Sequence, residues 1–298
     1  MQRLCEKQTK KHSRRVCINH RLMNLHTFLK EQLEKVPVAK ANYEKLKQIK
    51  TKSFQFDGYE IFVHFNPARA VSSLAKLDAK SIAERPCFLC PKNRIEGQVA
   101  IDFKEKYEIC INPFPICDEH FTVVSKIHEP QSIEGKIRDM IDLAKEYSDF
   151  IALFNGSKSG ASAPDHMHFQ LVNKDYFPYP IETPMAGVVE KIVLHSSNAD
   201  ELEAKISAEI NRLNHEGELP ASHVNLFCEY KNDEWVFTIF PRIQHRPRQF
   251  FSEGEDRLMM SPGAIDMTGH LIAAREEDFE KITKEVIIDI FKQISGEK

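Results

Sequence analysis

The hydrophobic positions change their period several times along the chain, and each change predicts a different element. Apolar residues at helical spacing over residues 24–50 predict two helices separated by Pro37. Alternation over Phe54–Phe65, interrupted at Asp57 and Gly58, predicts two strands joined by a turn. The same reasoning predicts strands at Tyr107–Asn112, His120–Ile127, Val188–Leu194 and, as a hairpin, residues 223–240, and helices at 133–153 and Asp200–Leu213. The segment from Ser261 to Ile282 reads as a turn, a strand and a closing helix.

The stretch Phe154–Leu171 (FNGSKSGASAPDHMHFQL) joins a loop rich in glycine and serine to an alternating strand. Successive side chains of a strand point to opposite faces, so one set can enter a core while the other faces a cleft. The polar set comprises His166, His168 and Gln170, and the apolar set comprises Met167, Phe169 and Leu171.

The order of these elements predicts an α+β fold, a mainly antiparallel sheet with helices packed on it. Residues 1–22 are basic and lack apolar periodicity, which predicts a flexible tail. Residues 23–175 would form the catalytic core, and residues 176–298 a C-terminal α+β portion packed on that core.

Composition narrows the class of protein. The chain has 298 residues, of which 42% are hydrophobic and 29% charged, as in ordinary globular proteins. A net charge of -3 argues against a protein that coats nucleic acid or an anionic membrane. No apolar run approaches the roughly 20 residues of a membrane span, and no signal-peptide pattern is visible. We therefore expect a cytoplasmic protein without nucleic-acid or membrane partners.

The seven cysteines include one CxxC pair, Cys87 and Cys90, bounded by prolines. In a chain without an export signal, this favours reduced thiols over a disulfide framework. Two thiolates at this spacing can bind one tetrahedral Zn²⁺. A redox pair and two thiols without a special role are the alternatives.

The two histidines of the alternating strand suit catalysis. A neutral imidazole is both a nucleophile and a good zinc ligand, so His166 and His168 need not share one task. The preceding loop offers backbone N–H groups and hydroxyls suited to phosphate oxygens. Two histidines that merely form hydrogen bonds in a half-buried strand are the structural alternative.

These residues carry a resemblance to a known superfamily. The segment NGSKSGASAPDHMHFQ resembles the active-site motif of the histidine-triad superfamily, in the transferase branch that contains galactose-1-phosphate uridylyltransferase, the diadenosine-tetraphosphate phosphorylases and GDP-L-galactose phosphorylase. CFLCPKNR, NPFPI, HFTVVSKIHEPQS and SPGAIDMTGHLIAAREEDFEKI resemble further segments of that branch. Asp165 and Met167 depart from the uridylyltransferase pattern. The resemblance implies a histidine-triad-like antiparallel sheet, elaborated by the C-terminal α+β extension.

The resemblance also implies an activity. The chain would be a nucleotidyltransferase or phosphorylase for a nucleoside-diphosphate sugar or a dinucleoside polyphosphate. His168 would attack the α-phosphorus, and a phosphate or sugar-phosphate acceptor would then take the nucleotide from the histidine. Gln170 would bind phosphate without acting as acid or base, which favours transfer over hydrolysis. No organic cofactor is implied.

The remaining site residues follow from the same resemblance. His166 would ligate zinc, or orient His168 if no metal is bound, and His120 is an alternative fourth ligand. Apart from the resemblance, the local basic cluster of Arg242, His245, Arg246 and Arg248 is a candidate for contacting the acceptor phosphate, with a solvated loop as the alternative. The implied zinc ligands are Cys87, Cys90, His128 and His166, and the implied phosphate-binding residues are Asn155, Lys158, Ser159, Gly160 and Ser162, with Arg69 and Arg94 as candidates.

Two rival functions stay open at this stage. A hydrolase of the same superfamily would transfer the nucleotide to water. A non-catalytic, zinc-stabilised module would bind nucleotides without turning them over.

Overall fold

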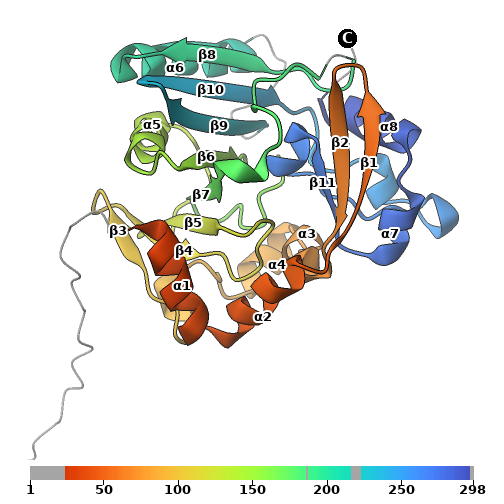
Figure 1. Ribbon diagram of the computed structural model, residues 1–298, viewed down its shortest axis with the longest axis horizontal. Coiled ribbons are helices and arrows are strands. Elements are labelled where there is room, and N and C mark those ends of the chain that lie inside the picture. Colours follow the sequence, from red (N-terminus) through yellow and green to blue (C-terminus); the bar gives the residue numbers. More distant parts are fainter. Residues whose placement is uncertain (1–23, 186, 216–222, 296–298) are drawn as a thin grey trace, which may run out of the picture.

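The computed structural model describes residues 24–185, 187–215 and 223–295. The predicted tail, residues 1–22, lies outside these ranges. Eight strands form one antiparallel sheet in the order β3-β4-β5-β7-β6-β9-β10-β8, and three strands form a smaller sheet in the order β1-β2-β11 (Figure 1). The predicted α+β fold is confirmed.

The large sheet contains strands from both halves of the chain. Its strands are β3 (Ile101–Phe103), β4 (Tyr107–Ile111), β5 (His120–Ser125), β6 (Phe150–Asn155), β7 (His168–Asn173), β8 (Ile192–Ser196), β9 (Val224–Lys231) and β10 (Glu234–Pro241). Strand β6 pairs with β9, so the C-terminal portion extends the sheet begun by the N-terminal portion. The division at residue 175 stays a prediction.

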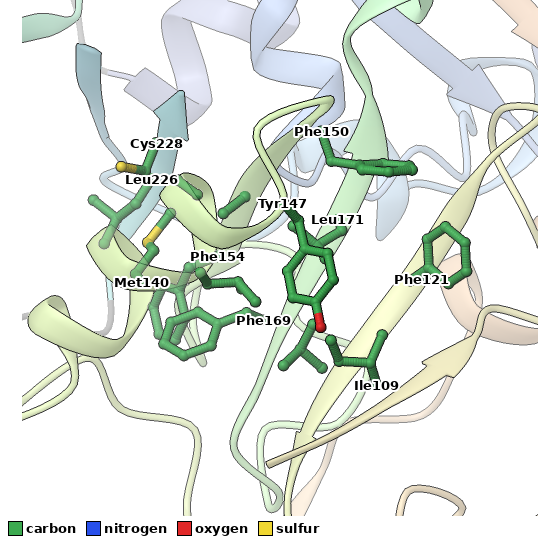
Figure 2. Close-up of a cluster of buried hydrophobic side chains, with 14 of the residues drawn as sticks. Ile109, Phe121, Met140, Tyr147, Phe150, Phe154, Phe169, Leu171, Leu226 and Cys228 are labelled. Carbon is green, nitrogen blue, oxygen red and sulfur yellow. The ribbon is translucent and has the colours of Figure 1, made fainter. Parts of the chain in front are cut away.

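One face of the large sheet is covered by helices. α1 (Leu25–Lys35), α2 (Pro37–Leu46), α5 (Ile137–Glu146) and α6 (Ala199–His215) all contribute to the apolar cluster on this side. Pro37 begins α2 at a position where its missing N–H costs nothing. Figure 2 shows how Phe154 and Phe169, from neighbouring strands, pack with Met140 of α5.

The opposite face is covered by the small sheet and the end of the chain (Figure 1). β1 (Lys50–Phe56) and β2 (Tyr59–Phe65) form the predicted hairpin, and β11 (His270–Ala273) pairs parallel to β2. The other helices are α3 (Ala70–Ser73), α4 (Ala79–Glu84), α7 (Glu276–Lys281) and α8 (Lys284–Ser295). α8 buries Ile287, Ile290 and Ile294 in this second apolar cluster.

The helix predicted over residues 133–153 is wrong in its second half. α5 ends at Glu146, and Phe150–Asn155 is the central strand β6. Every residue of β6 is buried, because the sheet is covered on both faces. Such a strand lacks the alternation that distinguishes it from a buried helix in sequence. The strand predicted at Val188–Leu194 is displaced as well, since β8 spans Ile192–Ser196.

Candidate active site

Strand β7 lies between β5 and β6 and presents the predicted faces. Phe169 and Leu171 are fully buried in the helix-side cluster, together with Met167 just before the strand. His168 and Gln170 therefore face the other side of the sheet, toward the small sheet and the C-terminal segments.

The ring of His168 has a defined orientation. Its Nδ1 lies 2.8 Å from the carbonyl oxygen of His166, which can only accept a hydrogen bond. Nδ1 therefore donates, and Nε2 carries the lone pair. Burial lowers the pKa of His168 to about 4, so the ring is neutral at neutral pH. A neutral imidazole with a directed Nε2 lone pair is the form that attacks phosphorus.

The sequence reasoning missed Gln131, which holds the backbone of His168. The Gln131 side chain accepts from His168 N at 2.8 Å and donates to His168 O at 3.0 Å and to Asn155 O at 2.8 Å. It thus bridges β6 and β7 beyond their last paired residues, Leu153 and Gln170. A lone glutamine in a loop offers no sequence signal for such a role.

Gln170 is oriented by His120, whose role the sequence left open. Ile116 N donates to His120 Nδ1 at 3.2 Å, so the ring proton is on Nε2, which lies 2.7 Å from Gln170 Oε1. Burial, with the positive charge of Arg69, lowers the pKa of His120 to about 3 and keeps this arrangement over the neutral range. The amide nitrogen of Gln170 is left as the donor at the cleft.

Gln170 lines a narrow cleft with a cavity volume of about 40 Å³. Asn155, Gly160 and Ser162 line the same wall of the cleft. His168 is not among the lining residues, and only 5% of its surface is exposed.

The loop between β6 and β7 is anchored on the far half of the chain. Asn155 Oδ1 accepts from Ala264 N at 2.7 Å and from Asn225 Nδ2 at 2.9 Å. Asn225 also donates to Ser159 O, and the buried Arg242 donates to Asn225 Oδ1 at 2.6 Å. Because the oxygen of Asn155 is engaged, its Nδ2 is the group that can donate to a phosphate oxygen in the cleft.

Only some of the other predicted phosphate-binding residues line the cleft. Gly160, Ser162 and Arg69 line the cleft. Ser159 is fully buried, and Lys158 is exposed; neither lines the cleft. Arg94 lies outside the cleft and forms an ion pair with Glu108.

The four predicted metal ligands do come together. The ligand atoms of Cys87, Cys90, His128 and His166 all lie within 4.8 Å of one another. His166 Nδ1 is 3.2 Å from Cys87 Sγ, 3.6 Å from Cys90 Sγ and 3.2 Å from His128 Nδ1. Tetrahedral zinc bonds of about 2.0–2.3 Å place ligand atoms about 3.3–3.8 Å apart, so the cluster fits a shared ion.

The donor chemistry also fits a cation. His166 Nε2 lies 2.8 Å from Ser125 O and must donate to it, so Nδ1 turns a lone pair toward the cluster. A carbonyl partner on the outer nitrogen is typical of metal-bound histidine. These four residues can therefore hold a metal ion. His120 lies with Gln170 instead and does not belong to the cluster.

Comparisons with known proteins agree with this architecture. A domain of unknown function (DUF4922) matches residues 28–173. No curated protein matches. The crystal structure of yeast Ap4A phosphorylase Apa2 superposes with a TM-score of 0.56 at 15% identity, covering 87% of this chain and 96% of that chain. Its complexes with AMP (TM-score 0.57, 15% identity) and with Ap4A (TM-score 0.53, 16% identity) each cover 90% of this chain and 96% and 97% of theirs.

The chain has the Apa2 fold. This confirms the expected α+β fold with a mainly antiparallel sheet. Among the described residues, no helix is long and apolar enough to cross a membrane.

Proposed function

We propose that this protein is a nucleotidyltransferase of the phosphorylase type that works through a nucleotidyl-histidine intermediate on His168. The observation that carries the proposal is the hydrogen bond from His168 Nδ1 to the carbonyl of His166, which aims a neutral Nε2 away from the strand. The shared fold with yeast Ap4A phosphorylase supports the same reaction type.

The reaction has two displacements. His168 Nε2 attacks the α-phosphorus of the substrate, a P–N bond forms, and the bridging P–O bond breaks with its electron pair on the leaving phosphate. An oxygen of the acceptor phosphate or sugar phosphate then attacks the same phosphorus, and the electron pair of the P–N bond returns to Nε2. The proton stays on Nδ1 of His168 throughout, where it is donated to the His166 carbonyl. Because His168 is buried, the cleft has to open toward it during the first step.

Gln170 would act as a fixed donor. Its amide nitrogen is turned toward the cleft by His120 and can bind a phosphate oxygen as charge develops. An amide cannot activate water as a base, so the site favours a phosphate acceptor over hydrolysis.

The substrate class is a dinucleoside polyphosphate or a nucleoside-diphosphate sugar. The yeast structures in complex with AMP and Ap4A make adenine dinucleotides the first candidates. We place the reaction in the cytoplasm, where thiols such as Cys87 and Cys90 stay reduced.

The metal cluster would hold Zn²⁺ in a structural role. Two thiolates and two imidazoles fill its four positions and leave none for substrate. His166 would connect this site to catalysis, since its ring belongs to the cluster and its carbonyl orients His168.

Mass spectrometry of the intact protein after mixing with dinucleotide or nucleotide sugar tests the proposal. We expect an added nucleotidyl mass on His168 that phosphate removes, and no adduct in His168→Asn. His195→Asn, on the exposed edge strand β8, is the matched control and should keep the adduct. Turnover that ignores phosphate and sugar phosphate would indicate a hydrolase. Nucleotide binding without any adduct or turnover would indicate a non-catalytic module.

A further inference from the structure

One wall of the cleft is built mainly from residues that follow the histidine strand in the sequence. His245, Arg246 and Ser261 line it, and Ser73 and Arg69 close its side. His245, Arg246 and Ser261 lie outside residues 28–173, the segment matched by the domain family, whereas Arg69 and Ser73 lie within it. The histidine strand and this wall therefore come from different parts of the sequence.

Arg246 is held rigidly in this wall. Its Nε donates to Ser261 Oγ at 3.0 Å, and its Nη2 donates to Ala75 O at 3.0 Å and Ser73 O at 3.4 Å. The guanidinium group also lies 4.0 Å from the ring centroid of Phe250. Its Nη1 has no hydrogen-bond partner among residues 24–185, 187–215 and 223–295. A guanidinium fixed by other contacts binds an anion with little further loss of entropy.

The charge around this wall is positive. Burial and the cations Arg246, Arg242 and Lys158, with His223, lower the pKa of His245 to about 3. No aspartate or glutamate lines the cleft within the described part of the chain. Both carboxylate oxygens of the nearby Asp266 accept hydrogen bonds from backbone N–H groups, those of Gly263 and Ile272. Fixed cations and hydroxyls without a facing carboxylate suit a phosphate group, which has several acceptor oxygens.

We infer that Arg246, Ser261 and Ser73, with the charge of Arg69, form an anion subsite that binds the phosphate group of the acceptor. That the bound phosphate belongs to the acceptor rests on the proposed function. That phosphate binds at this subsite does not. In the transfer step, an oxygen of this phosphate forms the new bond to the α-phosphorus. The bond from that phosphorus to His168 Nε2 breaks, and its electron pair returns to the ring. Residues from both ends of the chain thus select the acceptor together.

Titration calorimetry with inorganic phosphate, and separately with a hexose 1-phosphate, tests the subsite in the full chain. Arg246→Gln should weaken binding of whichever of the two compounds binds, by about tenfold or more, the range expected for a lost charge-assisted hydrogen bond. The matched control is Arg248→Gln, because Arg248 lies in the same loop but pairs with Asp289 at the surface. Ser261→Ala is a second variant that keeps the arginine and should weaken binding a few-fold.

The two proposals fail separately. His168→Asn should bind phosphate like the unmodified protein, because its subsite is intact. If Arg246→Gln folds and binds both anions as tightly as Arg248→Gln, or if neither anion binds at millimolar concentration, the subsite is refuted. If phosphate binds through Arg246 but no adduct forms on His168, the subsite stands and the proposed reaction fails. The anion that binds, inorganic phosphate or the sugar ester, identifies the acceptor class.

Discussion

The side-chain amide of Gln131 forms the hydrogen bonds to the His168 backbone that a paired strand would otherwise form. It accepts from the N–H of His168 and donates to its carbonyl, at 2.8 and 3.0 Å. The main chain of the proposed nucleophile is thus fixed by a buried amide, while its ring is fixed by the His166 carbonyl. The orientation of Nε2 depends on both.

Gln131→Met should therefore harm both stability and chemistry. The apolar side chain keeps the volume but leaves three buried backbone groups unpaired, at a cost of about 3 kcal/mol in the free energy of unfolding. A displaced nucleophile should slow adduct formation by on the order of 10–100-fold. Urea unfolding and the rate of adduct formation measure the two effects. Ser132→Ala, next in the chain, is the control, and equal effects of the two substitutions would contradict the role of Gln131.

Gly160→Ala should push apart the two loops that form the cleft. Gly160 has a φ of +92°, and a Cβ there would lie 2.4 Å from Gly263 Cα and 2.8 Å from Pro262 O. Gly135→Ala is the matched control, because Gly135 has a φ of +67° but no atom within 4 Å of a Cβ. Both variants bear the backbone strain, of about 1 kcal/mol, but Gly160→Ala alone should also lose phosphate binding and adduct formation. Normal activity of Gly160→Ala would show that the close approach of the loops is dispensable.

Elemental analysis should find about one zinc ion per chain, as expected for a closed Cys₂His₂ site. Cys90→Ser should lose the ion and lower the melting temperature, and a strong chelator should do the same to the unmodified protein. Cys110→Ala removes a buried thiol outside the cluster and should keep the ion. A metal-free protein with an oxidised Cys87–Cys90 pair would instead favour the redox alternative.

The protein should lose stability as the pH falls from about 6.5 toward 4. Burial lowers the pKa of His64 to about 4, and burial also lowers those of His270, His120 and His245 to about 3. The unfolded chain binds protons at these histidines below pH 6.5, whereas the folded protein does not, so acid favours unfolding. Each histidine contributes up to about 1.4 kcal/mol per pH unit within this window.

Urea unfolding between pH 7.5 and 4.5 measures this dependence. The rings of His64 and His270 stack with Nε2 of His64 3.1 Å from Nδ1 of His270. Replacing His270 with phenylalanine should make the curve less steep in the acid range. A free energy of unfolding that stays constant between pH 6.5 and 4.5 would contradict the neutral, buried state of these rings.

Several features of the site were readable in the sequence because they depend on neighbouring residues. The alternation of Phe169 and Leu171 with His168 and Gln170 fixes which side chains share a face, since a strand repeats every two residues. The spacing of Cys87 and Cys90 predicts half of a metal site in the same way. The remaining ligands, His128 and His166, came from the resemblance, whereas the α+β class of the fold came from the order of the predicted elements.

Other features were decided only by the tertiary structure, because they join segments that are far apart in the sequence. Gln131 reaches His168, and His120 turns the amide of Gln170, through contacts across 37 and 50 residues. The basic loop shows the same limit. Within seven residues, Arg242 is buried, Arg246 lines the cleft and Arg248 pairs with Asp289 at the surface, in an irregular segment whose pattern has no period. Residue types along the chain show which chemistry is possible, whereas the packing of distant segments selects the side chains that carry it out.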